Sequence, residues 1–63
     1  MITYDLIQPQ NHKQTQITCT VLPKVGEIIF YSNNPLEVIR IDHHINENNN
    51  TIIIIVEVKD YTE

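Results

Sequence analysis

Residues 51–58 are the most restrictive segment of this sequence, because they read Thr-Ile-Ile-Ile-Ile-Val-Glu-Val. β-Branched side chains lose rotamer freedom in a helix and pack well on a pleated sheet, so the segment predicts a β-strand. Alternate residues of a strand point to opposite faces. The even-numbered residues 52–58 therefore form one apolar face, and Ile53 and Ile55 make the opposite face apolar as well.

The rest of the chain has the same character, since Ile, Val and Thr supply 23 of its 63 residues. Strand-like runs separated by turn-forming residues cover 2–8, 16–21, 27–31, 36–45 and 51–59. Gly26, the only glycine, fits a bulge or a positive-φ corner before the third run, and Leu22-Pro23-Lys24-Val25 fits a turn. Short connections favour pairing between sequential strands, and closure of the sheet removes its edges. The predicted fold is an all-β, five-stranded antiparallel meander that closes into a small barrel, as one domain over 1–63.

Two segments resemble a known superfold. Residues 22–29 read Leu-Pro-Lys-Val-Gly-Glu-Ile-Ile and are followed by Leu-Glu-Val-Ile-Arg-Ile at 36–41. This pattern resembles the Pro-x-x-Gly-[Asp/Glu]-x-[Val/Ile] entry and the following strand of small SH3-like barrels. The resemblance implies a superfold that hosts many functions, so it carries no binding or catalytic residue with it. The Ile- and Asn-rich composition also resembles that of small phage or mobile-element proteins.

Charge is distributed unevenly along the chain. Residues 1–24 carry two lysines and one aspartate (2 − 1 = +1), whereas residues 25–63 carry two basic and seven acidic side chains (2 − 7 = −5), for a net charge of −4. An acidic chain disfavours nucleic acid and anionic membranes and favours a basic protein surface as partner. No apolar run approaches the roughly 20 residues that span a bilayer, so we expect a cytoplasmic protein, in the host cytoplasm if it is phage-encoded.

The apolar residues exceed what one small core usually holds. A chain of this length buries only about 60% of its unfolded surface, and one cysteine cannot form an intrachain disulfide, so self-association is the remaining means of stabilisation. Strand alternation assigns the surplus to an interface, made by Ile29, Tyr31, Leu36, Val38, Ile53 and Ile55. The alternative is a tightly wrapped monomer in which a β-bulge shifts the alternation of the strand faces.

Few residues suggest chemistry. Asp42, His43 and His44 are adjacent, but neighbouring strand residues point to opposite faces, so the two histidines cannot bind one metal within a straight strand. Cys19 lies on the apolar side of its predicted strand and is expected in the core. A single glycine rules out glycine-rich phosphate loops, and no catalytic arrangement is evident. We expect no enzyme activity, no catalytic residue, no metal and no cofactor.

The sequence therefore favours a non-enzymatic binding protein that acts by protein–protein interaction as a homodimer or larger oligomer. If the mobile-element composition is meaningful, it would inhibit or regulate a host protein. One alternative is an oligomer that sequesters a small phosphate-containing anion at subunit interfaces, through Arg40, His43, His44 and Lys59 pooled from several chains. A further alternative is a structural subunit of a larger assembly.

Overall fold

A computed structural model describes residues 1–62, apart from the side chain of Asn11. Its elements are β1 (Ile2–Gln8), a short 3-10 turn η1 (Pro9–Asn11), β2 (Lys13–Cys19), β3 (Ile28–Tyr31), β4 (Asn34–Asn46) and β5 (Thr51–Asp60). The predicted all-β class is confirmed. Within the described residues there is no helix with the length and hydropathy needed to cross a membrane.

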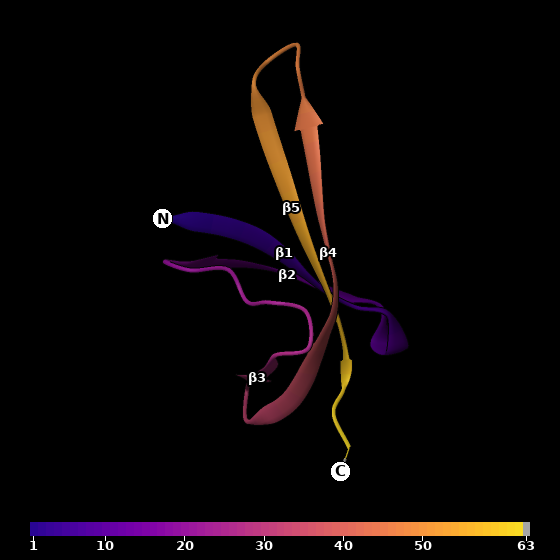
Figure 1. Cartoon of the computed structure of the whole chain (residues 1–63). Helices are drawn as coiled ribbons and strands as arrows, with labels where there is room; N and C mark the ends of the chain where they lie inside the picture. The colour runs from indigo at the N-terminus through magenta and orange to yellow at the C-terminus, as the bar shows by residue number, and fades with distance from the viewer. Residues whose placement is uncertain (63) are drawn as a thin grey trace.

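The five strands form one sheet in the order β2-β1-β5-β4-β3 (Figure 1). Three neighbouring pairs are antiparallel, β1 with β2, β3 with β4 and β4 with β5, whereas β1 and β5 run parallel from Asp5↔Ile55 to Ile7↔Glu57. The prediction of a purely antiparallel meander is therefore wrong. The connection after β2 leads to β3 at the opposite edge of the sheet, so β2 and β3 do not pair. The first and last strands of the chain, β1 and β5, pair with each other instead.

The sheet curls into an open half-barrel (Figure 1). Its edge strands are β2 and β3, and β3 has four residues that all pair with β4. Because these two edges do not pair with each other, the predicted closure into an SH3-like barrel is also wrong. What holds of that prediction is a curled, barrel-like sheet.

The corner before β3 has the positive φ that was predicted at Gly26. Gly26 has a φ of 92°, and its N–H donates to the carbonyl of Val38 at 2.8 Å. The turn itself is closed by the Glu27 N–H and the Lys24 carbonyl at 3.0 Å, so it lies two residues later than predicted. A glycine adopts this positive φ without the steric cost of a Cβ.

The core lies inside the curl of the sheet. Its side chains are all at most 7% exposed, and they come from β1, β4 and β5: Tyr4, Leu6, Leu36, Val38, Val56 and Val58. Partly buried residues from β2, β3 and the connection between them extend it, including Ile17, Cys19, Leu22, Ile29 and Tyr31. The core therefore joins the β1–β2 hairpin to the antiparallel strands β3, β4 and β5 across the parallel β1–β5 pair.

A β-bulge in β4 sets which side chains reach this core. The pairing with β5 shifts between Val38 and Arg40, so Ile39 is an extra residue on β4. Before the bulge Val38 pairs with Val58, and after it Ile41 pairs with Val56. Paired residues share a face, so the bulge places Leu36 and Val38 on the same side as Ile41, opposite to Arg40 and Asp42. Without the bulge, simple alternation would place them on the side of Arg40.

Candidate protein interface on the β4–β5 arm

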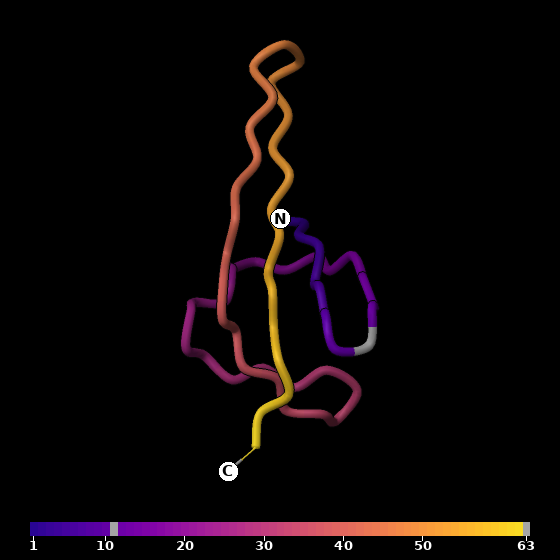
Figure 2. The backbone as a smooth tube through the Cα atoms, turned by 90° about the vertical axis from the view of Figure 1, so that its right-hand side faces the viewer, coloured from indigo at the N-terminus to yellow at the C-terminus, as the bar shows by residue number. Residues whose placement is uncertain are grey.

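The hairpin of β4 and β5 is much longer than the rest of the sheet. The two strands pair as far as Asn46↔Thr51, whereas β1 accompanies β5 only over residues 55–57. The part of the hairpin beyond this point, residues 43–54, extends past the β1–β5 pairing and is here called the arm (Figures 1 and 2). The arm makes the molecule elongated, with principal extents of 43 × 24 × 19 Å.

Large apolar side chains are exposed on the arm. Ile45, Ile52 and Ile53 are 68%, 59% and 54% exposed. Ile45 and Ile52 form a cross-strand pair on the core side, and Ile53 pairs with His44 on the outer side. Both faces of the arm are therefore apolar, and no described residue covers these three isoleucines to the extent seen in the core.

The edge of β5 that faces away from β4 is also unpaired along the arm. No described residue pairs with the β1 side of β5 over residues 51–54. Natural edge strands are usually protected by charged side chains, prolines or a short length. The other edge of the arm, on β4, carries His43 and His44 and begins next to Asp42, whereas residues 51–54 are Thr-Ile-Ile-Ile and carry no charge. The β5 edge is thus the less protected edge of the arm.

The exposed area of the single chain is larger than its size requires. A compact monomer of 7.4 kDa exposes about 4200 Å², whereas this chain exposes 4796 Å². Its radius of gyration is 12.2 Å, compared with about 10.6 Å for a compact domain of this length. The excess of roughly 600 Å² approaches the ~800 Å² that each partner contributes to a standard protein interface.

The Arg40 and Lys59 side chains of β4 and β5 already have acidic partners. The Arg40 Nε lies 3.0 Å from the Asp42 carboxylate, and this hydrogen bond, together with the charge of Asp42, raises the pKa of the guanidinium. The Lys59 Nζ lies 3.7 Å from Glu37 Oε1. His43 pairs with Ile54 and His44 with Ile53, so the two imidazoles face opposite sides of the arm. Within one chain these four predicted anion ligands do not converge.

The six residues predicted for an interface fall into different environments. Leu36 and Val38 are buried in the core, and Ile29 and Tyr31 are half-buried against it. On β5, Ile55 is half-buried and Ile53 is exposed. The reason for assigning Leu36 and Val38 to an interface, their surplus to the core, does not hold, because the bulge at Ile39 brings them into it.

Strand alternation missed two exposed residues of the arm. Ile45 and Ile52 lie on the same face as the core, and they are exposed because β1 does not pair with β5 at this level and the core does not extend to it. The available signal was the distance along the hairpin, since both residues stand next to the 46–51 turn. Cys19 packs against the core as expected, and the described residues contain no group of three His, Cys, Asp or Glu that could hold a metal ion.

Comparisons of this chain with protein families, with curated proteins and with solved structures find no match.

Proposed function

We propose that this chain is a non-enzymatic binding protein that acts by protein–protein interaction, and that its arm associates with a second copy of the chain. The observation that carries the proposal is the combination of exposed isoleucines and an unpaired, uncharged β5 edge on the same four residues, 51–54. An exposed edge of this kind is a template for strand pairing with another chain.

Strand pairing along β5 accounts for the two apolar faces. When two strands pair edge to edge, neighbouring side chains on both faces of the joined sheet come within about 4.5–5.5 Å of each other. An antiparallel pairing centred on Ile53, with residues 52–54 opposite the same residues of a second copy, would bring Ile52 next to Ile54 on one face and the two Ile53 side chains together on the other. A single contact would then cover both faces.

The lack of charge on residues 51–54 permits a second copy to pair with this segment. Two chains that each carry a net charge of −4 repel each other unless their contact avoids the acidic residues. Residues 51–54 carry no charge, and a two-fold axis makes the same patch serve both partners. The excess exposed area of each chain is close to what one standard interface covers.

The anion-sequestering alternative has less support. Arg40 and Lys59 pair with Asp42 and Glu37 on their own chain, so an anion would have to displace these carboxylates. A regulator or inhibitor of a host protein remains compatible with the proposal, because a dimer of this size can block a protein surface without chemistry.

The molar mass in solution tests the proposal. Light scattering behind a size-exclusion column should give twice the chain mass of 7.4 kDa at high protein concentration, falling toward 7.4 kDa on dilution. A mass of one chain at every concentration contradicts self-association. Continued growth of the mass with concentration contradicts a closed two-fold dimer and favours an open assembly.

A further inference from the structure

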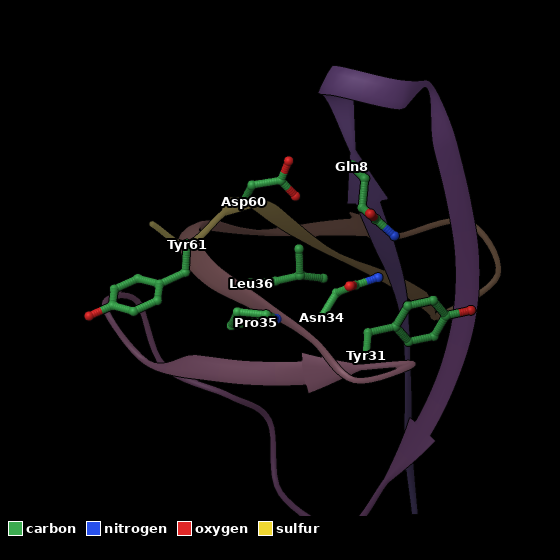
Figure 3. Close-up of a pocket in the computed structure, with 7 residues that line it drawn as sticks. All are labelled: Gln8, Tyr31, Asn34, Pro35, Leu36, Asp60 and Tyr61. Atoms are coloured by element: carbon green, nitrogen blue, oxygen red, sulfur yellow. The ribbon is translucent and has the colours of Figure 1, made fainter. Parts of the chain in front are cut away.

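A second candidate site lies at the end of the sheet opposite the arm. Seven residues around the β3–β4 turn, the end of β1 and the end of β5 line a hollow of about 350 Å³: Gln8, Tyr31, Asn34, Pro35, Leu36, Asp60 and Tyr61 (Figure 3). Figure 3 shows Gln8 and Asp60 on one side, Leu36 in the middle, and the two tyrosine rings toward the ends. The volume suits a single side chain or a small molecule.

Gln8 is the unusual residue of this hollow. It is 6% exposed and continues the buried row of β1 after Tyr4 and Leu6. Among residues 1–62, the side chain of Asn11 excepted, no hydrogen bond to the Gln8 amide is present, yet no buried side-chain polar atom lacks a partner, so the amide atoms themselves keep contact with solvent. The amide borders the hollow, so a ligand there can take the place of water as its hydrogen-bond partner.

Asp60 gives the hollow its charge. The Gln10 Nε2 donates to Asp60 Oδ1 at 3.1 Å, which orients the carboxylate and leaves Oδ2 available. No basic side chain lines the hollow, because the neighbouring Lys59 lies on the outer face, where it pairs with Glu37. Of the described residues, the one charged residue that lines the hollow is therefore acidic, which favours a cationic ligand.

The aromatic residues are held at the rim by backbone contacts. Tyr31 pairs with Asn34 across a two-residue turn, in which Ser32 and Asn33 have φ values of 51° and 68°. The Tyr61 N–H donates to the Pro35 carbonyl at 3.1 Å, which fixes the chain just after β5. Phenol rings at these positions offer faces on which a flat cation can stack.

We propose that this hollow binds the guanidinium group of an arginine side chain from a protein partner. A guanidinium presents five N–H donors in one plane, and the hollow offers acceptors on separate residues: the Asp60 carboxylate and the side-chain oxygens of Gln8 and Asn34. An ammonium group is a compact charge that cannot stack on a tyrosine ring in the same way. The site goes beyond the proposed self-association and names a basic partner by its chemistry.

The probe is Nα-acetyl-arginine amide, added to the full chain and followed by NMR of the Gln8 and Asn34 side-chain amides. The same compound made with citrulline is the control, because citrulline keeps the shape and removes the charge. Arginine should shift these amide signals with a dissociation constant on the order of 1 mM, as for a fragment-sized ligand. Equal shifts with citrulline would overturn the proposal.

Two variants separate the hollow from the general acidity of the chain. Asp60→Asn removes the carboxylate and should weaken arginine binding about tenfold or more. Glu47→Gln, in the loop at the far end of the arm, changes the net charge by the same amount and should leave the affinity within about twofold. An equal loss in both variants overturns the site, and the citrulline comparison decides the matter if Asp60→Asn does not fold.

Two further comparisons fix the source of the guanidinium and the relation to the arm. An arginine-containing peptide should bind at least about tenfold more tightly than the single amino-acid amide if the partner is a protein. Equal affinities contradict a protein source. A monomeric arm variant should bind the arginine probe like the wild type, so the two proposals can fail separately.

Discussion

Replacing Ile52 and Ile53 with glutamate should convert the proposed dimer to a folded monomer. Burying a whole isoleucine side chain is worth about 1.5–3 kcal/mol, and these two are 59% and 54% exposed in the single chain. Their further burial is thus worth about 1.7–3.4 kcal/mol per chain, and a two-fold axis counts it twice. Ordering costs offset part of this sum. The lower end of the doubled sum is about 3.4 kcal/mol, so even after this offset we expect the dissociation constant to increase at least about a hundredfold. Repulsion between the introduced glutamates adds to this increase.

Sedimentation equilibrium over a range of concentrations measures this change. The matched control is Val21→Glu with Val25→Glu, because both valines are exposed and lie in the connection before β3, away from the arm. The control adds the same two negative charges and should alter the dissociation constant by less than about tenfold. The reasoning is refuted if the control dissociates as readily as the arm variant, or if the arm variant remains a dimer.

Three predictions concern the fold of the single chain. Leu6→Ala should lower the free energy of unfolding by about 2–5 kcal/mol in urea titrations, because Leu6 is fully buried, whereas Val21→Ala should change it by less than about 0.5 kcal/mol. Burial, with a smaller contribution from Cys19, raises the pKa of Tyr4 above 10, so its contribution to stability should be complete below pH 10 and lost as pH rises through the folded-state pKa. Tyr4→Phe should remove that part of the alkaline loss, and an unchanged pH profile in the variant contradicts it. Gly26→Ala should destabilise by about 1 kcal/mol or more, measured by thermal unfolding, because of backbone strain at its φ of 92°.

The strands could be predicted from the sequence because each carries its own signal. Residues 2–8 match β1, and the predicted runs 36–45 and 51–59 differ from β4 and β5 by at most two residues at either end. The second run was displaced, since β2 begins at Lys13 and ends at Cys19. Its polar first half has no apolar alternation because it lies at a sheet edge, and the exposed Val21 falsely extended its end.

The arrangement of the strands could not be read from local signals. Parallel pairing of β1 with β5 joins residues about fifty positions apart in the chain, and no turn residue encodes such a contact. No glycine marks the bulge at Ile39, yet it reverses which face Leu36 and Val38 occupy.

The length of the hairpin is also not a local signal. Strand alternation assigned Ile53 to an interface but missed Ile45 and Ile52, whose exposure depends on how far the hairpin extends beyond the β1–β5 pairing.

The hollow was invisible in the sequence for a related reason. Gln8 and Asp60 lie at opposite ends of the chain, and Gln8 stands where a core residue of β1 would be expected. Only the parallel contact between β1 and β5 brings them to the same end of the sheet.

Backbone hydrogen exchange at residues 51–54 tests the proposed self-association most directly, because it reports both that the chains associate and where. Mass spectrometry of the corresponding peptide should show slower exchange as the protein concentration rises, while the loop at residues 47–50 exchanges quickly throughout. The variant with Ile52→Glu and Ile53→Glu should show no dependence of this exchange on concentration, because the pairing with β4 within one chain is all that protects the segment. Exchange at residues 51–54 that is independent of concentration in the wild type would contradict pairing through the β5 edge.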